Sequence, residues 1–329
     1  MGLSDRTVLA IDGGNSKTDV ALVTTDGTVL ARARGGASNH QVIGVEAAFD
    51  VLRGLVAEVG AATPVDHVHA CLAGVDLEEE ERELSARLQA EGWGRHAVLA
   101  NDTFAVLRSG LSDDGVGRGG LAVVCGAGLN CVGVASDGRT TRFLALGEMS
   151  GDWGGGGDVG QQAAWSAIRA EDGRGPDTVL RQTVPAHLGL ERAVDVAHAR
   201  YHDKIAYEDL YDLVPLVYDA ARDGDDVARA LLDRLAEEVC TMLEVAAHRL
   251  DLEDSPCQVV LGGGLLTTPD PSLRSRVHAG LTRRIPRASA VLTPVAPIAG
   301  AALLGLDAVG ADLAALRAAR AGFGDPTGH

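Results

Sequence analysis

The sequence predicts an α/β protein built from two similar lobes, and three observations carry this prediction. Short apolar, β-branched segments alternate with segments whose apolar residues recur at helical spacing. The order strand, glycine turn, strand, Asp-Gly turn occurs twice, with Asp26-Gly27 and Asp137-Gly138 lying 111 residues apart. At 329 residues, the chain also has roughly the length of two ordinary domains. Together these features predict a duplicated unit with a cleft between its two copies.

The first half of the chain begins with a strand that stops at Gly13-Gly14 and a second strand that stops at Asp26-Gly27. Glycine turns between apolar runs are typical of tight connections between neighbouring strands. The segment 45–59 has apolar residues at helical spacing and predicts a helix. In this half we expect strands at 7–11, 18–23, 28–31, 67–72 and 97–100, and helices at 45–59, at 78–89 and after Asn101-Asp102.

The second half repeats this beginning and then becomes mostly helical. An apolar strand stops at the turn 126–128, and a second strand precedes Asp137-Gly138. The segment 151–252 has a mostly helical pattern, and its longest amphipathic stretch is 225–250. In this half we expect strands at 121–125, 131–135 and 259–261, and a final helix that begins at Pro297.

Composition and charge exclude several classes of function. The net charge of −17 is spread along the chain, so a nucleic-acid backbone is an unsuitable partner. No stretch approaches the ~20 apolar residues that a membrane-spanning helix needs, and the first residues lack a signal-peptide pattern. The five cysteines form no CxxC pair, which argues against a disulfide framework and a structural zinc site. We therefore expect a soluble, cytoplasmic protein that binds neither nucleic acid nor membrane.

Glycine is the unusual feature of the composition, with 42 residues in the chain. Three clusters follow predicted strands, at Gly13-Gly14, at 126–128 and at 262–264. Glycine lets backbone N–H groups approach an anion closely, so three such turns on a duplicated scaffold predict a nucleotide site. The sequence has neither a P-loop nor a GxGxxG turn that enters a helix. A fourth cluster, at 154–157, is expected to be a mobile closing loop, with a flexible linker as the alternative.

Two of these glycine motifs resemble those of a known superfamily. Residues 11–18, IDGGNSKT, resemble the first phosphate motif of the actin, sugar-kinase and heat-shock ATPase superfamily, and residues 125–131, CGAGLNC, resemble the second. Over about residues 7–306 the chain is similar to the BadF/BadG-type ATPase and N-acetylglucosamine kinase family. The resemblance implies an actin-like ATPase fold, in which two duplicated ribonuclease-H-like lobes enclose a nucleotide and sugar cleft. It implies lobes at 1–112 and 113–296, with a C-terminal helix at about 297–322 that joins the first lobe.

The same resemblance assigns residues to two ligands, ATP and a sugar. The other segments that resemble the family are GASNH at 36–40, LAGVD at 72–76, Asn101-Asp102, SGD at 150–152, VLGGG at 260–264 and PIAGAA at 297–302. The residues that it implies for ATP are Gly13, Gly14, Asn15, Ser16, Lys17, Thr18, Gly126, Ala127, Gly128, Asn130, Gly262, Gly263 and Gly264. The residues that it implies for the sugar are Ser38, Asn39, Gly74, Asp102, Glu148 and Asp152.

Two aspartates receive chemical roles from this resemblance. Asp12 ends a predicted strand, where a carboxylate can hold Mg²⁺ against the β- and γ-phosphates of ATP. Asp102 is expected to be the general base that accepts the proton of the attacking sugar hydroxyl. The alternatives are that the turn alone favours Asp12 and that Asp102 is the N-cap of the following helix.

The remaining sugar residues have alternatives, and one position departs from the family pattern. Asn39 offers an amide suited to sugar hydroxyls, and the alternative is that Ser38-Asn39 forms a surface turn. Lys17 could contact a phosphate, and the alternative is that it is a solvated side chain. Family kinases usually place a Trp in a GGWG segment six residues before the GD aspartate, where this chain has Leu146. We expect a reshaped wall of the sugar site, with Trp153 or Glu148 as substitutes.

The resemblance implies an ATP- and Mg²⁺-dependent kinase that phosphorylates N-acetylglucosamine, glucosamine or a related amino sugar at its 6-hydroxyl. An ATPase that activates an electron-transfer enzyme through an iron–sulfur cluster is an alternative, but Cys125 and Cys131 are expected to be buried in strands. A catalytically silent sugar sensor is a third, although it would not need both Asp12 and Asp102. The sequence leaves the oligomeric state open, and the apolar helical surface around 225–250 is compatible with a homodimer.

Overall fold

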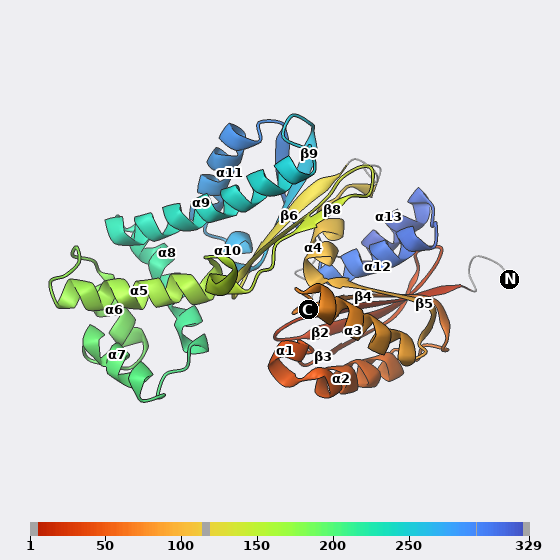
Figure 1. Ribbon diagram of the computed structural model, residues 1–329, viewed down its shortest axis with the longest axis horizontal. Helices are drawn as coiled ribbons and strands as arrows, with labels where there is room; N and C mark the ends of the chain where they lie inside the picture. The colour runs from red at the N-terminus through yellow and green to blue at the C-terminus, as the bar shows by residue number, and fades with distance from the viewer. Residues whose placement is uncertain (1–5, 114–118, 294, 325–329) are drawn as a thin grey trace.

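The protein is described from a computed structural model, which covers residues 6–113, 119–293 and 295–324. Residues 1–5 and 114–118, which belong to the beginnings of the two predicted lobes, lie outside the described residues. Figure 1 shows two bodies that each contain one β-sheet, with helix α4 (Asp102–Gly110) between them.

The first sheet is formed by β1 (Thr7–Gly13), β2 (Thr18–Thr24), β3 (Val29–Gly35), β4 (Val65–Leu72) and β5 (Gly94–Asn101). Its five strands lie in the order β3-β2-β1-β4-β5. The pairs β1–β2 and β2–β3 are antiparallel, whereas β1–β4 and β4–β5 are parallel. The carboxyl ends of β1, β4 and β5 therefore lie at one edge of the sheet, where ligands bind in many α/β proteins.

The second sheet is formed by β6 (Gly120–Cys125), β7 (Leu129–Val134), β8 (Thr140–Arg142), β9 (Cys257–Gly262) and β10 (Ala288–Leu292). Its order, β10-β9-β6-β7-β8, repeats the order of the first sheet with β6 in the place of β1. The directions also match, because β6–β7 and β7–β8 are antiparallel while β6–β9 and β9–β10 are parallel. The predicted duplication is thus confirmed, although the short strands β8 and β10 were not predicted from the sequence.

One face of the first sheet is covered by helices from the same half of the chain. Helix α2 (Val45–Glu58) buries Phe49, and helix α3 (Glu78–Ala90) buries Leu84. Both side chains belong to one apolar cluster with Ile11 of β1. The predicted helices at 45–59 and 78–89 are therefore confirmed, each with its apolar face toward the sheet.

The other face of each sheet is covered by helices that come after the last strand of the other sheet. The helix after β5 packs on the second sheet, and the helices after β10 pack on the first. The helices concerned are α4 (Asp102–Gly110), α12 (Pro297–Ala308) and α13 (Leu313–Phe323). Val106 of α4 packs with Val260 of the second sheet, whereas Leu303 of α12 packs with Ala10 of the first. This exchange links the two sheets and places the beginning of α4 near the edge between them.

Helices α4 and α12 touch through a glycine. A Cβ atom at Gly300 would lie 1.8 Å from the carbonyl oxygen of Ala105, well inside van der Waals contact. Only a residue without a side chain lets the two backbones approach this closely.

The second lobe carries a thick helical layer on its other face. The layer consists of α5 (Gly155–Glu171), α6 (Leu180–His187), α7 (Ala193–Tyr201), α8 (Val214–Arg222), α9 (Asp226–Arg249), α10 (Gly264–Thr267) and α11 (Ser272–Arg284), with the 3-10 turns η3 (Gly147–Ser150) and η4 (Glu208–Leu213). The apolar side chains of α9, including Leu232, Leu235 and Leu243, are buried in the core of this lobe. The apolar stripe around 225–250 is therefore a core face and does not support a homodimer, which stays a prediction. Within the described ranges, no helix is long and apolar enough to cross a membrane.

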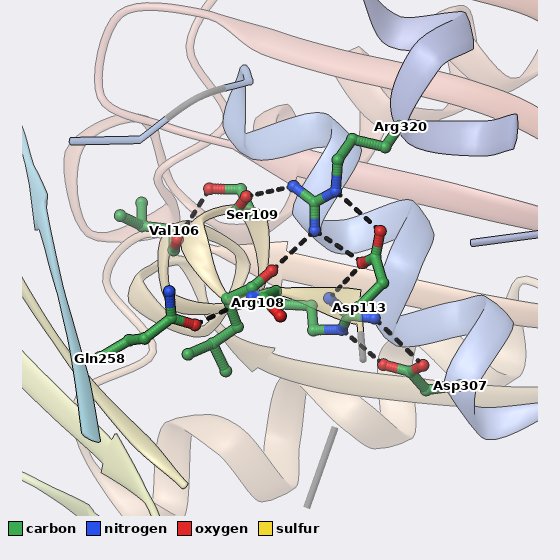
Figure 2. A network of polar contacts seen from close by, with 9 residues as sticks. Val106, Arg108, Ser109, Asp113, Gln258, Asp307 and Arg320 are labelled. Atoms are coloured by element: carbon green, nitrogen blue, oxygen red, sulfur yellow. Dashed lines mark hydrogen bonds and ion pairs between the residues drawn. The ribbon is translucent and has the colours of Figure 1, made fainter. Parts of the chain in front are cut away.

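A buried ionic network holds the end of α4 against the C-terminal helices (Figure 2). Arg108 of α4 donates to Asp307 at 2.7 Å and to Asp113 at 3.1 Å. Arg320 of α13 donates to Asp113 at 2.8 Å and to the carbonyl oxygen of Leu111 at 2.8 Å. Burial of Asp113 opposes its charge, but the hydrogen bonds from Arg320 and Arg108 outweigh this effect and lower its pKa. The network fixes the segment that leaves the first lobe.

Candidate functional site

The first glycine turn connects β1 to β2 and lies against the segment that follows β3. Gly14 donates its N–H to the carbonyl oxygen of Lys17 at 2.9 Å, which closes the turn. A Cβ atom at Gly13 would lie 2.3 Å from Ser38 Oγ, so glycine is required for the contact between the two segments. Lys17 pairs with Asp19 at 3.6 Å and is half-exposed. The predicted phosphate turn and the predicted sugar segment are thus neighbours.

Ser38 and Asn39 are both buried, so their interpretation as a surface turn is wrong. Ser38 Oγ accepts a hydrogen bond from Thr18 Oγ1 at 2.8 Å. Asn39 Nδ2 donates to Asn15 Oδ1 at 2.6 Å, which joins the sugar segment to the phosphate turn. Gly74 has a φ of +81°, and a Cβ atom there would lie 2.4 Å from Asn39 Oδ1. The four predicted residues Asn15, Ser38, Asn39 and Gly74 therefore form one polar cluster.

Asp12 and Asp102 are two carboxylates at the edge of the first sheet, and the charge of Asp102 acts on Asp12. Asp12 lies near the carboxyl end of β1, and Asp102 follows the carboxyl end of β5. Burial, followed by the charges of Asp102 and Asp19, raises the pKa of Asp12 to about 8. Burial, followed by the charge of Asp76, raises the pKa of Asp102 to about 6. The surroundings of both carboxylates thus favour the binding of a cation or a proton.

Asn101, and not Asp102, caps helix α4. Asn101 Oδ1 accepts a hydrogen bond from the backbone N–H of Thr103 at 3.1 Å. Its Nδ2 group donates to the Asp76 carboxylate at 3.0 Å. The interpretation of Asp102 as the N-cap is therefore wrong. The sequence analysis also did not single out Asp76, whose pKa is raised to about 6 by burial and by the charge of Glu80.

The second glycine turn, Gly126 to Gly128, contacts the start of α5 directly. Gly156 N donates to the carbonyl oxygen of Gly126 at 2.8 Å, and Gly157 N donates to that of Ala127 at 3.0 Å. A Cβ atom at Gly155 would lie 2.5 Å from the backbone of Gly128. The expectation of a mobile loop or a linker at 154–157 is therefore wrong. These glycines are the buried first turn of a helix, because only glycine allows it to pack on the phosphate turn.

Asn130, which follows the second glycine turn, links it to the first lobe. Its Nδ2 group lies 3.5 Å from Asn101 Oδ1, the oxygen that caps α4. The end of β5, at Asn101, and the start of β7, at Asn130, are thus brought together across the boundary between the lobes.

The third glycine turn lies beside the end of β6. Gly263 has a φ of +84°, and a Cβ atom there would lie 2.3 Å from the carbonyl oxygen of Cys125. A Cβ atom at Gly262 would lie 2.7 Å from Val106 of α4, so Gly262 serves packing. Gly264 lines a cavity of about 420 Å³ that also has Tyr211 in its wall.

A cavity of about 500 Å³ lies between the two lobes. Its lining residues are Asn15, Ala127, Gly128, Leu129, Ala145, Gly147, Glu148, Asp152, Gly154, Asp158, Gln161, Tyr207 and Tyr211. Asn15 is the contribution of the first lobe. Predicted nucleotide residues (Ala127, Gly128) thus meet predicted sugar residues (Glu148, Asp152) in one space, whereas Asp12, Ser38, Asn39, Gly74 and Asp102 are not part of its lining.

Four polar side chains of this cavity were not predicted from the sequence: Asp158, Gln161, Tyr207 and Tyr211. Burial, followed by the charge of Asp158, raises the pKa of Tyr207. Asp158 also accepts a hydrogen bond from the backbone N–H of Gly154 at 2.8 Å. A spacing of four between the tyrosines indicates a shared helical face, but no sequence signal directs that face toward the cleft.

The segment that departs from the family pattern surrounds Asp152. Leu146 donates its N–H to Ser150 Oγ at 2.8 Å, and Ser150 Oγ in turn donates to the Asp152 carboxylate. Trp153 lies beneath the guanidinium group of Arg234, with 3.7 Å between the group and the ring centre. Trp153 lines a neighbouring cavity together with Asp152, so its role as a wall of the sugar site stays a prediction.

The cysteines have the properties of core thiols. All five are free and buried. Burial raises the pKa of Cys125 to about 12 and that of Cys240 to about 11, and it raises the pKa of Cys131 further. Neutral, buried thiols are poor ligands for an iron–sulfur cluster, which binds thiolates.

Comparison with known proteins places the chain in a family. A model of the BadF/BadG/BcrA/BcrD ATPase family matches residues 9–305, which is most of the chain. The chain belongs to this family. The resemblance inferred from the phosphate motifs is thereby confirmed, and the family match spans both lobes and α12.

Two relatives can be aligned with most of this chain. It is 27% identical to an N-acetylmuramic acid/N-acetylglucosamine kinase from Clostridium acetobutylicum over 265 residues, which cover 79% of this chain and 85% of the relative. It is 24% identical to an N-acetyl-D-glucosamine kinase from Dictyostelium discoideum over 320 residues, which cover 93% and 99%.

Solved structures agree with the fold. A Chromobacterium violaceum protein proposed to be an N-acetylglucosamine kinase is 26% identical and has a TM-score of 0.69, covering 91% of this chain and 98% of that one. A ROK family glucokinase from Streptomyces griseus, solved with glucose and AMPPNP, has a TM-score of 0.51 at 17% identity, covering 92% and 99%. The BadF/BadG family member thus has the predicted actin-like fold with two duplicated lobes.

Proposed function

We propose that this protein is a kinase that transfers the γ-phosphate of ATP to the 6-hydroxyl of an amino sugar, N-acetylglucosamine or glucosamine. The observation that carries the proposal is the pair Asp12 and Asp102, two carboxylates with raised pKa values at the edge of the first sheet where β1 and β5 end. The names of the two characterised relatives support the choice of an amino sugar. A cytoplasmic location accords with this activity, because ATP is supplied there.

Binding of ATP is assigned to the backbone of the glycine turns. The N–H groups of the first and second turns can approach phosphate oxygens closely, which suits an acidic protein with few lysines near the cleft. The cavity beside Gly264 adjoins the interlobe cavity at Tyr211, which lines both, and it has the volume for an adenosine group.

Asp12 is the residue that fits Mg²⁺. Its carboxylate is a hard oxygen donor, and the nearby charges of Asp102 and Asp19 oppose its ionisation in the free protein. A divalent cation would reverse that balance, because it stabilises the charged carboxylate. When bound, Mg²⁺ supplies positive charge that neutralises the phosphates of ATP.

Asp102 is assigned as the general base. Its pKa of about 6 leaves it ionised near neutral pH and able to accept a proton. In the proposed step, the sugar oxygen forms a bond to the γ-phosphorus while the bond between that phosphorus and ADP breaks. The hydroxyl proton passes to Asp102 as the new bond forms. Because Asn101 caps the helix, the Asp102 carboxylate is not needed for capping.

The amino sugar is assigned to residues from both lobes. Ser38, Asn39 and Gly74 would contribute from the first lobe, and Glu148 and Asp152 from the second. The hydrogen bond from Asn39 to Asn15 supports this, because it connects the sugar segment to a residue that lines the interlobe cavity.

A screen of acceptors tests this function. ADP release would be measured with ATP, Mg²⁺ and about twenty hexoses and amino sugars. We expect turnover with N-acetylglucosamine or glucosamine, and the product would be identified as the 6-phosphate by NMR. ADP release that does not depend on any sugar would contradict the proposal and favour an ATPase.

A further inference from the structure

Three cavities follow one another along helix α5, and the interlobe cavity is the first of them. The second cavity, of about 410 Å³, shares four lining residues with the first: Glu148, Asp152, Asp158 and Gln161. The third, of about 460 Å³, shares Gln162 and Arg234 with the second. The shared residues place the three cavities side by side in a row, here called the groove, which leads away from the proposed sugar site.

One face of α5 forms the floor of this groove. The lining residues of α5 recur at helical spacing: Asp158, Gln161, Gln162, Trp165 and Arg169. Helix α9 contributes the opposite wall, including Ala230 and Arg234. The apolar face of α9 is buried in the core, so these groove residues lie outside the packing of the lobe.

Aromatic rings with guanidinium partners line the groove at two positions. Trp153 lies under Arg234 at 3.7 Å, and Trp165 lies under Arg169 at 4.5 Å. Trp165 is 52% exposed, although it is one of the largest apolar side chains of the protein. Exposed aromatic rings offer flat faces for the C–H groups of a pyranose ring, while amides, carboxylates and guanidinium groups bind its hydroxyls.

We propose that this groove binds a second saccharide unit linked to the amino sugar, so that the acceptor is a glycan longer than a monosaccharide. The proposal rests on the proposed kinase function and names the substrate class of that site. Continuity with the interlobe cavity favours a glycan over a second copy of the chain. The mixture of Trp165 with Gln162 and Ser166 in one concave surface favours it too, because a pyranose presents both apolar faces and hydroxyls.

The test compares two acceptors, N-acetylglucosamine and its β-1,4-linked disaccharide, in the ADP-release assay. We expect the wild-type kcat/KM for the disaccharide to equal or exceed that for the monosaccharide. Trp165→Ala should lower the value for the disaccharide about tenfold, because a stacking contact is lost. The value for the monosaccharide should change less than about twofold. Tyr201→Ala is the matched control, because Tyr201 is an exposed aromatic residue of α7 that lines none of the three cavities.

A second variant fills the groove without removing a contact. Ala230 is exposed and lines the third cavity, so Ala230→Trp should block the second saccharide unit while leaving the monosaccharide unaffected. Because the position is exposed, the variant is expected to fold normally, which circular dichroism checks.

Several results would overturn the proposal. One is that the wild type phosphorylates the monosaccharide but not the disaccharide. Another is that both variants change kcat/KM for the two acceptors equally, or change neither value. If neither sugar is phosphorylated, the kinase function fails, and calorimetric titration with the disaccharide decides the groove separately. Equal affinity of wild type and Trp165→Ala would then reject it, whereas weaker binding by the variant would support it. A sedimentation change from dimer to monomer in Trp165→Ala, with unchanged sugar affinity, would identify the surface as a contact between copies.

Discussion

Asp12 is a carboxylate whose charge the folded protein disfavours. Burial and the charges of Asp102 and Asp19 raise its pKa to about 8, although Lys17 and Arg34 oppose this rise. From the ordinary pKa of an aspartate up to about pH 8, the folded protein therefore holds a proton that the unfolded chain has released. By linkage, the contribution of Asp12 makes the free energy of unfolding fall as pH rises through this window.

Replacing Asp12 with Asn should therefore stabilise the protein in a pH-dependent way. At pH 7, without divalent cations, Asp12→Asn should raise the free energy of unfolding by at least about 1 kcal/mol, because the amide is neutral in both states and folding no longer requires the uptake of a proton. Near pH 4 the difference should be small. Urea unfolding at both pH values measures it, and an equal effect at the two values would contradict the raised pKa.

Asp102 carries the prediction about catalysis. Asp102→Asn should lower kcat by about 10²-fold or more, as expected for loss of a general base, while the affinity for ATP stays nearly unchanged. Stopped-flow or steady-state ADP release gives kcat, and titration calorimetry gives the ATP affinity. Wild-type turnover in the variant would sink the assignment.

The pH profile separates this role from a structural one. Because the pKa of Asp102 is raised to about 6, wild-type activity should fall as pH falls through about 6, where the base becomes protonated. The residual activity of Asp102→Asn should lack this acid limb. Asp50→Asn, which removes an exposed carboxylate of α2, should retain it together with normal turnover.

At the scale of elements, glycines decide how helices meet. Gly155 lets α5 start directly on the second glycine turn, and Gly300 lets α12 touch α4. In the sequence, these two glycines cannot be distinguished from glycines that only form turns. Their function as contact points depends on which backbone lies opposite, and this is a property of the packed elements.

Two alanine substitutions should therefore have opposite signs. Gly300→Ala should lower the free energy of unfolding by roughly 1–3 kcal/mol, because its Cβ would overlap the carbonyl oxygen of Ala105. Gly54→Ala, in the middle of α2, should raise it by about 0.5–1 kcal/mol, because its Cβ would enter open space and alanine favours a helix. Urea unfolding measures both, and destabilisation by both would contradict this account.

At the scale of the whole molecule, the lobes are connected near the cleft by a few polar contacts. Arg142 of β8 pairs with Glu81 of α3 at 2.9 Å and donates to the carbonyl oxygen of Val75 at 3.0 Å. The exchange of α4 and α12, together with the ionic network of Figure 2, also connects the lobes. Such an arrangement is suited to a closing motion about the helices rather than to separation of the lobes.

Ligands should therefore draw the lobes together. Amino sugar with a non-hydrolysable ATP analogue should decrease the radius of gyration, because both ligands contact residues of the two lobes in the proposed complex. Small-angle X-ray scattering measures this change, with glycerol as a control for added solute. An unchanged radius of gyration at saturating ligand would contradict the closing motion.

Much of the fold could be predicted from local patterns. The strands at 7–11 and 121–125 and the helices at 45–59 and 78–89 were predicted because their apolar periodicity persists for several residues. The strand β8 was missed because three residues carry too little pattern. The apolar stripe of α9 was identified, but periodicity does not reveal what covers a helix face, and the stripe proved to be core.

The sequence by itself determined the duplicated α/β scaffold, the positions of the glycine turns and the aspartates beside them, because turn chemistry and periodicity act over short distances. Only the tertiary structure decided that Asn101 caps α4, that 154–157 begins a helix, and that Asp158 and Tyr207 line the cleft. Those outcomes depend on contacts between segments far apart in the chain. A buried glycine or a raised pKa reflects the neighbours that folding supplies, and no local pattern contains them.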